Sequence, residues 1–363
     1  MPLILASELE VFARRLLLAA GVRQDEAETL ASLLVRADLR GYPGHGVAHL
    51  PAYFDRIDVG LINVHAESRV LREGKTTAVI DADFGIGQMA AMRAIDLAIA
   101  KAREHGVGIV TVRHSGHVGR LGDYVERAAE SGMIGYAVVS LGGGNVAPYG
   151  AMEPVSGTNP MAFGIPGRNG QHIVLDFATA ALSMGEMLRH VGRGEPLPDG
   201  VMLDGYGNPT SNYRAFAGPP RGATLAFGGH KGSGLQLVAE MLAGLLSGNG
   251  LARDWRDRGA SAINAAFFEA IAVEEFMPLA EYLDLVEDLR QYVHSRRPRP
   301  VFEEVLLPGE RSRRVEAEQR IRGIEIDQED WSKLITRSEQ LGVTPPPTLA
   351  EHANVPGRAA KLD

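Results

Sequence analysis

The sequence contains no cysteine, and this absence removes several classes of protein at once. A chain without cysteine forms no disulfide framework, offers no thiolate to a metal, and has no cysteine nucleophile. It also lacks a basic excess: 37 lysine and arginine residues against 45 acidic residues give a formal net charge of −8 at pH 7. A nucleic acid is therefore not an expected partner, whereas a small anionic substrate needs only one or two local cations.

Long hydrophobic runs are missing as well. No window approaches the roughly eighteen apolar residues that a membrane span requires. The first residues, MPLILASELEVFARR, have neither the basic start nor the cleavage site of a secretory signal. The sequence thus predicts a cytoplasmic protein with no membrane partner. Its 363 residues, 45% of them hydrophobic, are ample for a core spread over two or three packed units.

The hydrophobic pattern predicts helices at both ends of the chain and a mixed sheet between them. Apolar residues recur at three- and four-residue steps from Ser7, the expected cap, to Gly21, and again from Gln24 to Arg40. A βαβ unit, a later strand and two further helices follow. From 133 to 232, short apolar runs broken by glycine, proline and asparagine indicate a mixed sheet with functional loops. The expected segments are a strand at 76–84, a helix at 87–106, a strand at 107–114, a strand at 266–273, and helices at 278–295 and 328–343.

Two pairs of histidines raise the question of a metal site. His45 and His49 are four positions apart, which places both on one face if residues 41–57 are helical, and His114 and His117 follow in HSGH. The metalloproteases with histidines at this spacing also need a glutamate between them, and here the intervening residues are glycine, valine and alanine. We therefore expect no metal. A metal-dependent hydrolase stays an alternative, which a chelator would reveal by abolishing activity.

Glycine-rich segments are the second candidate feature. DADFGIGQMA holds only a degenerate G-x-G-x-x-A at Gly85, Gly87 and Ala90, without an acidic residue about twenty positions later, so helix-start glycines are favoured over a Rossmann site. GGHKGSGL is more informative, because a helix start with Lys231 at its mouth attracts phosphate or carboxylate. The alternative is a turn with a solvated lysine. Asp176 ends an apolar strand, where capping and ligand binding are both open.

Several motifs together resemble the type 2 malate/L-lactate dehydrogenase family, which includes ureidoglycolate dehydrogenase, diketogulonate reductase and the cyclic-imine carboxylate reductases. The motifs are GHGVAHLPAY, HSGHVGRLGDY, APYGAMEPVSGTNPMAFGIP, LDFATAALSMGE, GGHKGSGL and LPGERSRR, in the family's order. The resemblance implies an α/β fold in which a mixed sheet, not a Rossmann fold, binds NAD or NADP beside a helical region from both chain ends. It also implies a homodimer and hydride transfer at C2 of a small 2-oxo or 2-hydroxy acid, or a related imine.

The resemblance also implies roles for individual residues and segments. His45 matches the proton donor to the carbonyl oxygen, a task that suits an imidazole with an unperturbed pKa of ~6.5, and His117 matches a histidine beside the substrate. Thr158 and Asn159 match a loop that borders the substrate, and His49 and Arg120 are candidate ligands of the substrate carboxylate. The implied cofactor-binding residues are Asp176, Phe177, Ala178, His230, Lys231, Pro308, Gly309 and Glu310. The expected segments are 1–70 (helical, with the catalytic histidine), 71–250 (cofactor-binding mixed sheet), 251–322 (an α/β segment completing both sites) and 323–363 (a C-terminal helix and a loose tail).

Five positions depart from the family pattern. Gly44 replaces a serine, His49 replaces the arginine that clamps the substrate carboxylate, Glu186 replaces a lysine, and His114 and Gly116 replace asparagines. A neutral imidazole offers one N–H where a guanidinium offers a permanent fork. Two explanations compete: a dehydrogenase whose substrate carboxylate is held by Arg120 or by a protonated His49, and an NAD(P)-binding protein with little or no turnover. The intact histidines and cofactor motifs favour the first.

Overall fold

The computed structural model describes residues 1–256 and 263–349, and the chain forms two compact units. One unit combines residues 1–65 with the segment that begins at Gly309, and the other spans Ala66–Pro308. The helical unit is therefore built from both ends of the chain, as the sequence predicts. The expected segment 251–322 is divided between the two units, and the expected loose tail after residue 349 lies outside the described residues.

The helical unit is a small bundle with one short β-ladder. Its helix α1 packs on α2, and Gly21, in a left-handed conformation with φ of 87°, ends the first helical segment as expected. Ser7 is not the cap, because the helix begins one residue earlier, after Leu5. The elements of this unit are α1 (Ala6–Ala19), α2 (Gln24–Leu39), the turns η1 (Pro43–His45) and η2 (Val47–His49), α3 (Leu50–Asp58), α11 (Glu310–Arg322), α12 (Gln328–Gln340), β1 (Leu3–Ile4) and β11 (Ile324–Glu325).

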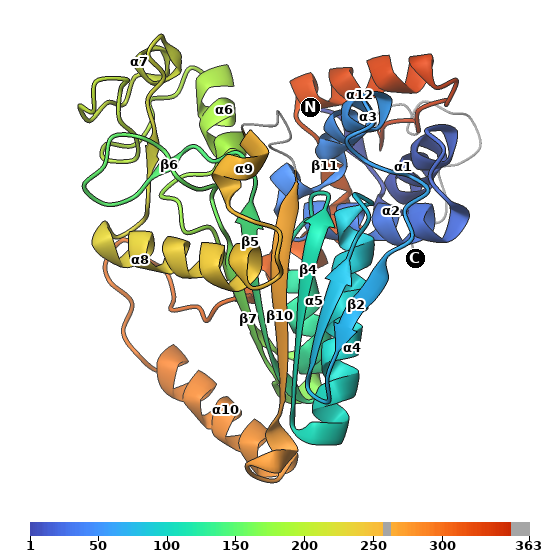
Figure 1. Cartoon of the computed structure of the whole chain (residues 1–363), viewed down its shortest axis with the longest axis vertical. Coiled ribbons are helices and arrows are strands. Elements are labelled where there is room, and N and C mark those ends of the chain that lie inside the picture. Colours follow the sequence, from blue (N-terminus) through green and yellow to red (C-terminus); the bar gives the residue numbers. More distant parts are fainter. Residues whose placement is uncertain (257–262, 350–363) are drawn as a thin grey trace. The chain divides into compact units, whose positions relative to one another are not determined.

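The second unit is built on a sheet that, in the described chain, has seven strands in the order β2-β3-β4-β10-β5-β7-β8 (Figure 1). Within it β3 and β4 are parallel, and the other neighbouring pairs are antiparallel. The prediction of a mixed sheet that is not a Rossmann fold is confirmed. The strands are β2 (Arg69–Glu73), β3 (Thr77–Asp81), β4 (Val107–Ser115), β5 (Met133–Leu141), β7 (Met161–Ile165), β8 (Ile173–Phe177) and β10 (Asn264–Ala272), with a separate pair β6 (Val146–Ala147) and β9 (Thr224–Leu225).

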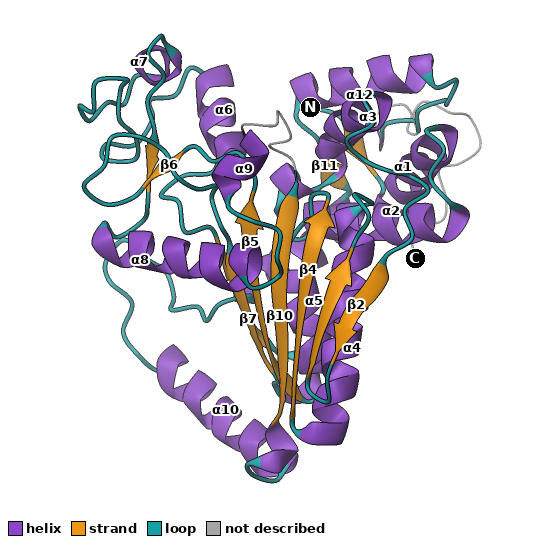
Figure 2. Ribbon diagram, in the orientation of Figure 1, coloured by secondary structure: helices purple, strands orange, loops and turns teal. Residues whose placement is uncertain are grey.

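Helices cover both faces of this sheet (Figure 2). Alternate residues of each strand point to opposite faces: Val139 joins the core under α4 and α5, whereas its neighbour Val138 joins a smaller core under α8 and the π-helical turn η4. None of the helices in the described chain is long and apolar enough to cross a membrane. The helical elements are α4 (Gly87–His105), α5 (Gly122–Glu130), η3 (Arg168–Gly170), α6 (Met184–Gly192), α7 (Tyr213–Ala217), α8 (His230–Ala239), η4 (Glu240–Leu245), α9 (Ala252–Arg256), η5 (Val273–Glu275) and α10 (Leu279–His294).

Candidate active site

His45 is the last residue of turn η1. The non-helical residue Gly46 separates this turn from turn η2, which contains His49. Gly46 is extended, with φ of −90° and ψ of −159°, so residues 41–57 do not form the single helix that would place both histidines on one face. Backbone hydrogen bonds define the turn: the His45 N–H donates to the Tyr42 carbonyl at 2.9 Å, and the Gly46 N–H donates to the Pro43 carbonyl at 3.2 Å. The turn therefore presents a half-buried His45 between two glycines rather than as one member of a helical pair.

His49 is uncharged in this structure. Its ring packs edge-on against Tyr53, with 4.8 Å between the ring centroids. Burial first, and then the nearby Arg56 and His45, lower the pKa of His49 to about 3. Removing a cationic imidazole from water disfavours its protonated form. This low pKa does not favour the hypothesis that a protonated His49 anchors the substrate carboxylate.

Arg56 is the cation that influences His49. His49 directly precedes helix α3, and Arg56 lies within this helix, seven positions later. This spacing places both side chains on one face of the helix. Burial lowers the pKa of the Arg56 guanidinium, while Tyr53 and Asp55 raise it. Arg56 is half-buried, and it forms no ion pair within the part of the chain that the structure describes. It is thus a cation with donors available to an anionic ligand.

His117 lies in the loop between β4 and α5, which packs closely on the start of α4. A Cβ on Gly87 would lie 2.2 Å from the Gly116 carbonyl oxygen and 2.4 Å from that of His117. The Gly116 N–H donates to the Gly85 carbonyl at 3.0 Å, and the Asn264 amide donates to the Gly116 carbonyl at 3.2 Å. Gly85 and Gly87 therefore allow close packing at a helix start. This is the role that the sequence analysis favours over a dinucleotide-binding fingerprint.

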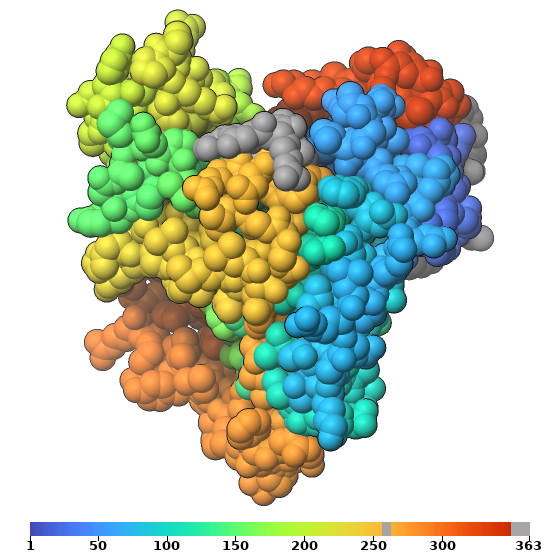
Figure 3. All heavy atoms as spheres, in the orientation of Figure 1, coloured from blue at the N-terminus to red at the C-terminus, as the bar shows by residue number. Residues whose placement is uncertain are grey.

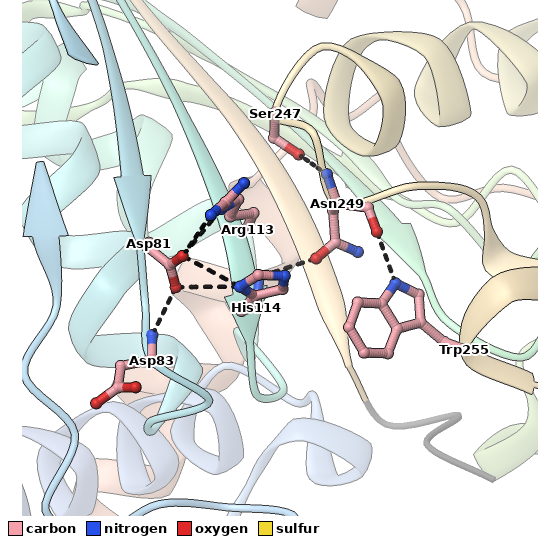
Figure 4. Close-up of polar contacts among 7 residues, drawn as sticks. All are labelled: Asp81, Asp83, Arg113, His114, Ser247, Asn249 and Trp255. Carbon is pink, nitrogen blue, oxygen red and sulfur yellow. Dashed lines mark hydrogen bonds and ion pairs between the residues drawn. The ribbon is translucent and has the colours of Figure 1, made fainter. Parts of the chain in front are cut away.

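A polar network that the sequence analysis missed joins the ends of β3 and β4 (Figure 4). Nε of Arg113 donates to Oδ2 of Asp81 at 2.9 Å, and Nδ1 of His114 lies 3.1 Å from the same oxygen. The His114 N–H donates to Oδ1 of Asn249 at 2.8 Å. Burial raises the pKa of Asp81, but three hydrogen-bond donors, the Asp83 N–H among them, outweigh burial and lower it below its usual value. Asp81 is thus a carboxylate, and Nδ1 of His114 carries the proton between them.

This network holds His114 in an uncommon backbone conformation three positions before His117. His114 has a φ of 51°, a left-handed value that residues with side chains adopt at a cost. Its ring stacks on Phe84, with 4.8 Å between the ring centroids. It also meets the edge of Trp255 at 5.7 Å, and Figure 4 shows these two side chains. The sequence does carry a signal for this network. Asp81 ends β3, and its register partner Arg113 lies near the end of the neighbouring parallel strand β4, so the predicted βαβ unit brings the two residues together.

Arg120 is already engaged within the protein. Its side chain is 1% exposed, and Nη1 forms an ion pair of 2.8 Å with Asp123, whose side chain is 4% exposed. A buried guanidinium that compensates a buried carboxylate is costly to withdraw. This ion pair does not favour a contact of Arg120 with the substrate carboxylate, and that contact stays a prediction.

Asn159 is a structural residue of the loop that precedes β7. Its side chain is fully buried, donates to Oε1 of Glu240 at 2.8 Å and accepts a hydrogen bond from the Leu141 N–H at 3.1 Å. The Asn159 side chain is thus engaged within the protein, and its contact with a substrate stays a prediction. The carbonyl of Thr158 accepts hydrogen bonds from the N–H and the hydroxyl of Thr179, both at 2.9 Å, while Thr158 itself is half-buried.

Asp176 accepts a hydrogen bond at the start of a helix, although not at the start of the next segment, which the sequence offers as one alternative. Its Oδ2 accepts a hydrogen bond of 2.7 Å from the Gly122 N–H at the beginning of α5, where a negative charge is favourable. The helix is not the following segment but one that precedes Asp176 by 54 positions. Phe177 packs edge-on against Phe227 at 5.6 Å, and Ala178 follows in a half-buried position.

The start of α8 has the form of an anion-binding site. Gly228 and Gly229 adopt φ values of 58° and 63°, which glycine reaches without strain, and α8 begins at His230 as predicted. His230 and Lys231 are exposed, and Lys231 forms no ion pair among the described residues. Free N–H groups at a helix start, with a lysine beside them, suit a phosphate group.

A cavity of about 470 Å³ opens beside this helix start. Tyr149, Leu203 and Phe227 form part of its apolar wall, and Gly150 and Gly228 form part of the remainder. A Cβ on either glycine meets no atom within 4 Å, so these positions face open space that side chains would otherwise fill. The volume lies in the range of small-molecule sites. The residues present thus fit a nucleotide cofactor, with backbone and apolar surface for its rings and α8 for its phosphates.

The predicted cofactor residues at 308–310 span the boundary between the two units. Pro308 belongs to the sheet unit, where its carbonyl accepts a hydrogen bond of 3.2 Å from the Val174 N–H. Gly309, with φ of 90°, and Glu310, 7% exposed in the first turn of α11, belong to the helical unit. Their contact with a cofactor stays a prediction.

Comparison with known proteins decides the family. The family model for malate/L-lactate dehydrogenase matches residues 4–335. The chain belongs to this family. Its members use NAD or NADP, and the chain is accordingly an NAD(P)-dependent 2-hydroxy-acid dehydrogenase by class.

Three relatives illustrate the range of the family. A malate dehydrogenase of Pyrococcus horikoshii is 37% identical over 306 residues, 83% of this chain and 84% of that protein, and its solved structure matches with a TM-score of 0.86 at 33% identity, covering 95% and 97% of the two chains. An L-lactate dehydrogenase of Cupriavidus necator is 35% identical, covering 92% and 96%. The structure of a delta1-piperideine-2-carboxylate reductase from Pseudomonas syringae matches with a TM-score of 0.81 at 31% identity, covering 93% and 100%.

Glu186, one of the departures from the family pattern, has a local structural reason. It lies exposed in the first turn of α6, and its N–H donates to the Ser183 hydroxyl at 3.2 Å. An acidic side chain is favourable at a helix amino terminus. Glu186 therefore stabilises α6 while it removes a positive charge.

Proposed function

We propose that this protein catalyses hydride transfer between NAD(P)H and C2 of a small 2-oxo acid, reversibly, or of a related cyclic imine. The family match over residues 4–335 is the observation that supports this most strongly. The relatives are named for malate, L-lactate and piperideine-2-carboxylate, and these compounds share a carboxylate beside the carbon that gains or loses hydride. The expected substrate therefore carries the same unit.

The cofactor supplies the hydride when it is bound. On this proposal the start of α8 and Lys231 receive its phosphates, because these groups are exposed and unpaired within the described chain. The apolar cavity beside α8 receives a ring. The other proposed cofactor contacts come from Asp176, Phe177, Ala178, His230, Pro308, Gly309 and Glu310.

His45 is the proposed proton donor and acceptor. A carbonyl that receives hydride at carbon must also receive a proton at oxygen, and an imidazole holds or releases a proton near neutral pH. His45 lies between Gly44 and Gly46 on the turn, and its side chain is half-buried. His117, on the tightly packed loop before α5, is the proposed second histidine beside the substrate, together with Thr158.

We further propose that Arg56, with the N–H of neutral His49, holds the substrate carboxylate. Arg120 is committed to Asp123 and His49 has no charge, which leaves the carboxylate without either expected cation. Arg56 is half-buried, lies on the same face of α3 as His49, and has no acidic partner in the described chain. A charge-assisted hydrogen bond of this kind is worth about 1.5–3 kcal/mol.

A homodimer is the proposed assembly, and an apolar stripe on α8 and η4 supports it. Leu235, Val238, Met241 and Leu245 recur at three- and four-residue steps and are 38%, 42%, 55% and 52% exposed. Their segment, coloured yellow, lies on the molecular surface in Figure 3. Exposed apolar surface on this scale is typical of a protein interface. The expected partner is the same stripe of a second copy.

The alternative is an NAD(P)-binding protein with little turnover, favoured by one observation: the expected carboxylate clamp is an uncharged His49. Such a protein would change NADH or NADPH fluorescence on mixing. It would leave the nicotinamide absorbance constant with every 2-oxo acid.

A panel of 2-oxo acids and cyclic imines, each with NADH and with NADPH, tests the proposal through nicotinamide oxidation. His45→Ala should lose most turnover, by a factor of roughly 10² to 10⁴, and keep its affinity for the cofactor. Lack of oxidation with every compound would leave the binding protein as the function. Undiminished turnover in His45→Ala would remove His45 from the mechanism.

A further inference from the structure

A buried carboxyl group supports the turns that contain His45 and His49. Asp38 is the penultimate residue of α2 and is 5% exposed. Its Oδ2 accepts a hydrogen bond of 2.8 Å from the Val47 N–H, the first residue of η2. No ion pair to Asp38 exists among residues 1–256 and 263–349. A buried acid without a cationic partner is unusual and requires a reason.

The backbone beside His45 lies directly on this carboxyl. A Cβ built on Gly46 would be 1.8 Å from Oδ1 of Asp38, 2.2 Å from its Cγ and 2.4 Å from Oδ2. Gly46 has a φ of −90°, which any residue adopts, so glycine is required here for space and not for conformation. Asp38 thus touches both residues that follow His45, Gly46 by contact and Val47 by a hydrogen bond.

The charged groups around Asp38 do not neutralise it. Burial above all, and then Asp330 on α12, raise the pKa of Asp38 to about 8, although the hydrogen bond from Val47 lowers it. Arg40, two residues later, is paired with Glu316 of α11 at 2.8 Å. On α1, Arg14 lies beside Glu28, at the other end of α2. The titratable groups on the two turns are His45 and His49, and His49 is uncharged.

We propose that Asp38 is a positioning residue for His45, which it fixes through Gly46 and Val47 as an uncharged carboxylic acid. The inference rests on the proposed role of His45. The uncharged acid fills the space under the turn and accepts the Val47 N–H without a buried charge. Ionisation leaves an unsolvated negative charge against Gly46, and admitting water to it requires the turn to open.

The first test does not depend on turnover. Asp38→Asn keeps the shape and an acceptor for Val47 but cannot ionise, and Asp25→Asn, an exposed position on the same helix, controls for loss of a charge. The folded chain holds the Asp38 proton up to about pH 8, whereas the unfolded chain releases it near 3.8. The urea midpoint of the wild type should therefore fall relative to Asp38→Asn as pH rises from 5 to 8 and then level off. A constant difference between the two proteins overturns the uncharged state of Asp38.

The second test concerns His45 itself. In the direction of 2-oxo acid reduction, the ratio of kcat/KM of Asp38→Asn to that of the wild type cancels every other titration. This ratio should rise about tenfold between pH 7 and pH 9, because roughly one wild-type molecule in eleven keeps the Asp38 proton one unit above its pKa. Amide exchange over residues 43–49 should accelerate in the wild type over the same range. A flat ratio together with the expected stability difference overturns the positioning role.

Gly46→Ala alters the other side of the contact between Asp38 and Gly46. Its methyl group would overlap the Asp38 carboxyl, so kcat/KM should fall at least tenfold, whereas Gly185→Ala in α6, where the nearest atom is 3.6 Å away, should change little. Equal activity of Gly46→Ala and Gly185→Ala overturns the proposal. If the wild type turns over no substrate, the proposed function fails, and the urea and exchange measurements still decide the role of Asp38.

Discussion

The uncharged state of His49 predicts a specific weakness in acid. The unfolded chain binds a proton at this imidazole with a pKa near 6.5, whereas the folded chain binds it only near 3. Between these values the unfolded state holds more protons, so the free energy of unfolding falls as pH decreases. The stabilisation from a neutral His49 is complete above about pH 6.5 and is lost progressively as pH falls toward 3.

The magnitude follows from the two pKa values. Between pH 7 and pH 5, the differential protonation of His49 removes about 2 kcal/mol from the free energy of unfolding. His49→Gln keeps a hydrogen-bonding side chain and cannot titrate, so its loss over the same interval should be smaller by about 2 kcal/mol. Both proteins share every other titrating group, and the comparison isolates this imidazole.

Urea unfolding at pH 7 and pH 5 measures the effect in the unit that contains His49. The chain has two tryptophans: Trp331 on α12 is in the helical unit and Trp255 on α9 is in the sheet unit. In a Trp255→Phe background, Trp331 fluorescence reports the helical unit, where it packs near Phe12. Equal acid losses in the wild type and His49→Gln would refute the low pKa and would reopen a charged His49 as the carboxylate anchor.

Three further predictions test the other proposals. Arg56→Gln should raise KM for the 2-oxo acid by roughly ten- to a hundredfold and leave the dissociation constant of the cofactor unchanged; an unchanged KM would exclude Arg56 as the carboxylate ligand. Asp81→Asn should destabilise the protein by about 1–3 kcal/mol in urea and lower kcat more than cofactor affinity, because the His114 turn before His117 loosens; normal kcat would make the network structural only. Met241→Lys should convert a dimer to a monomer in light scattering, and an unaltered mass would exclude the α8 stripe as the interface.

The parts of the fold that follow from hydrophobic periodicity were predicted well. The helix at 87–106 and the strand at 107–114 appear as α4 and β4, within one residue of the expected ends, and the parallel pairing of β3 with β4 confirms the βαβ unit. Helix α11, with the sequence ERSRRVEAEQRIR, was missed because it has almost no apolar stripe. The close contact at Gly46 was also missed, since the carboxyl group that packs against it lies eight positions earlier in the chain.

The sequence proposes candidate site residues, but it does not reveal their charge states in the folded chain. From residue type alone, His45, His49 and Arg120 are predicted to carry a proton or a positive charge, because their unperturbed pKa values suit proton transfer or carboxylate binding. In the folded chain, burial lowers the pKa of His49, and the buried Asp123 forms an ion pair with Arg120. Neither effect has a signal in a single sequence, since both depend on which side chains become neighbours.

The ionisation states near His45 together make a chemical argument about the substrate. Asp38 is a protonated acid and His49 a deprotonated base at neutral pH, so neither contributes charge beside the turns that contain His45. Of the groups singled out there, Arg56 alone is cationic and forms no ion pair in the described chain, although Asp55 acts on it electrostatically. A single cation favours a substrate with one carboxylate at this position, because a second anionic group here would have no countercharge. A monocarboxylic 2-oxo acid should therefore have a higher kcat/KM than a dicarboxylic one of similar size, and Arg56→Gln should reduce this preference.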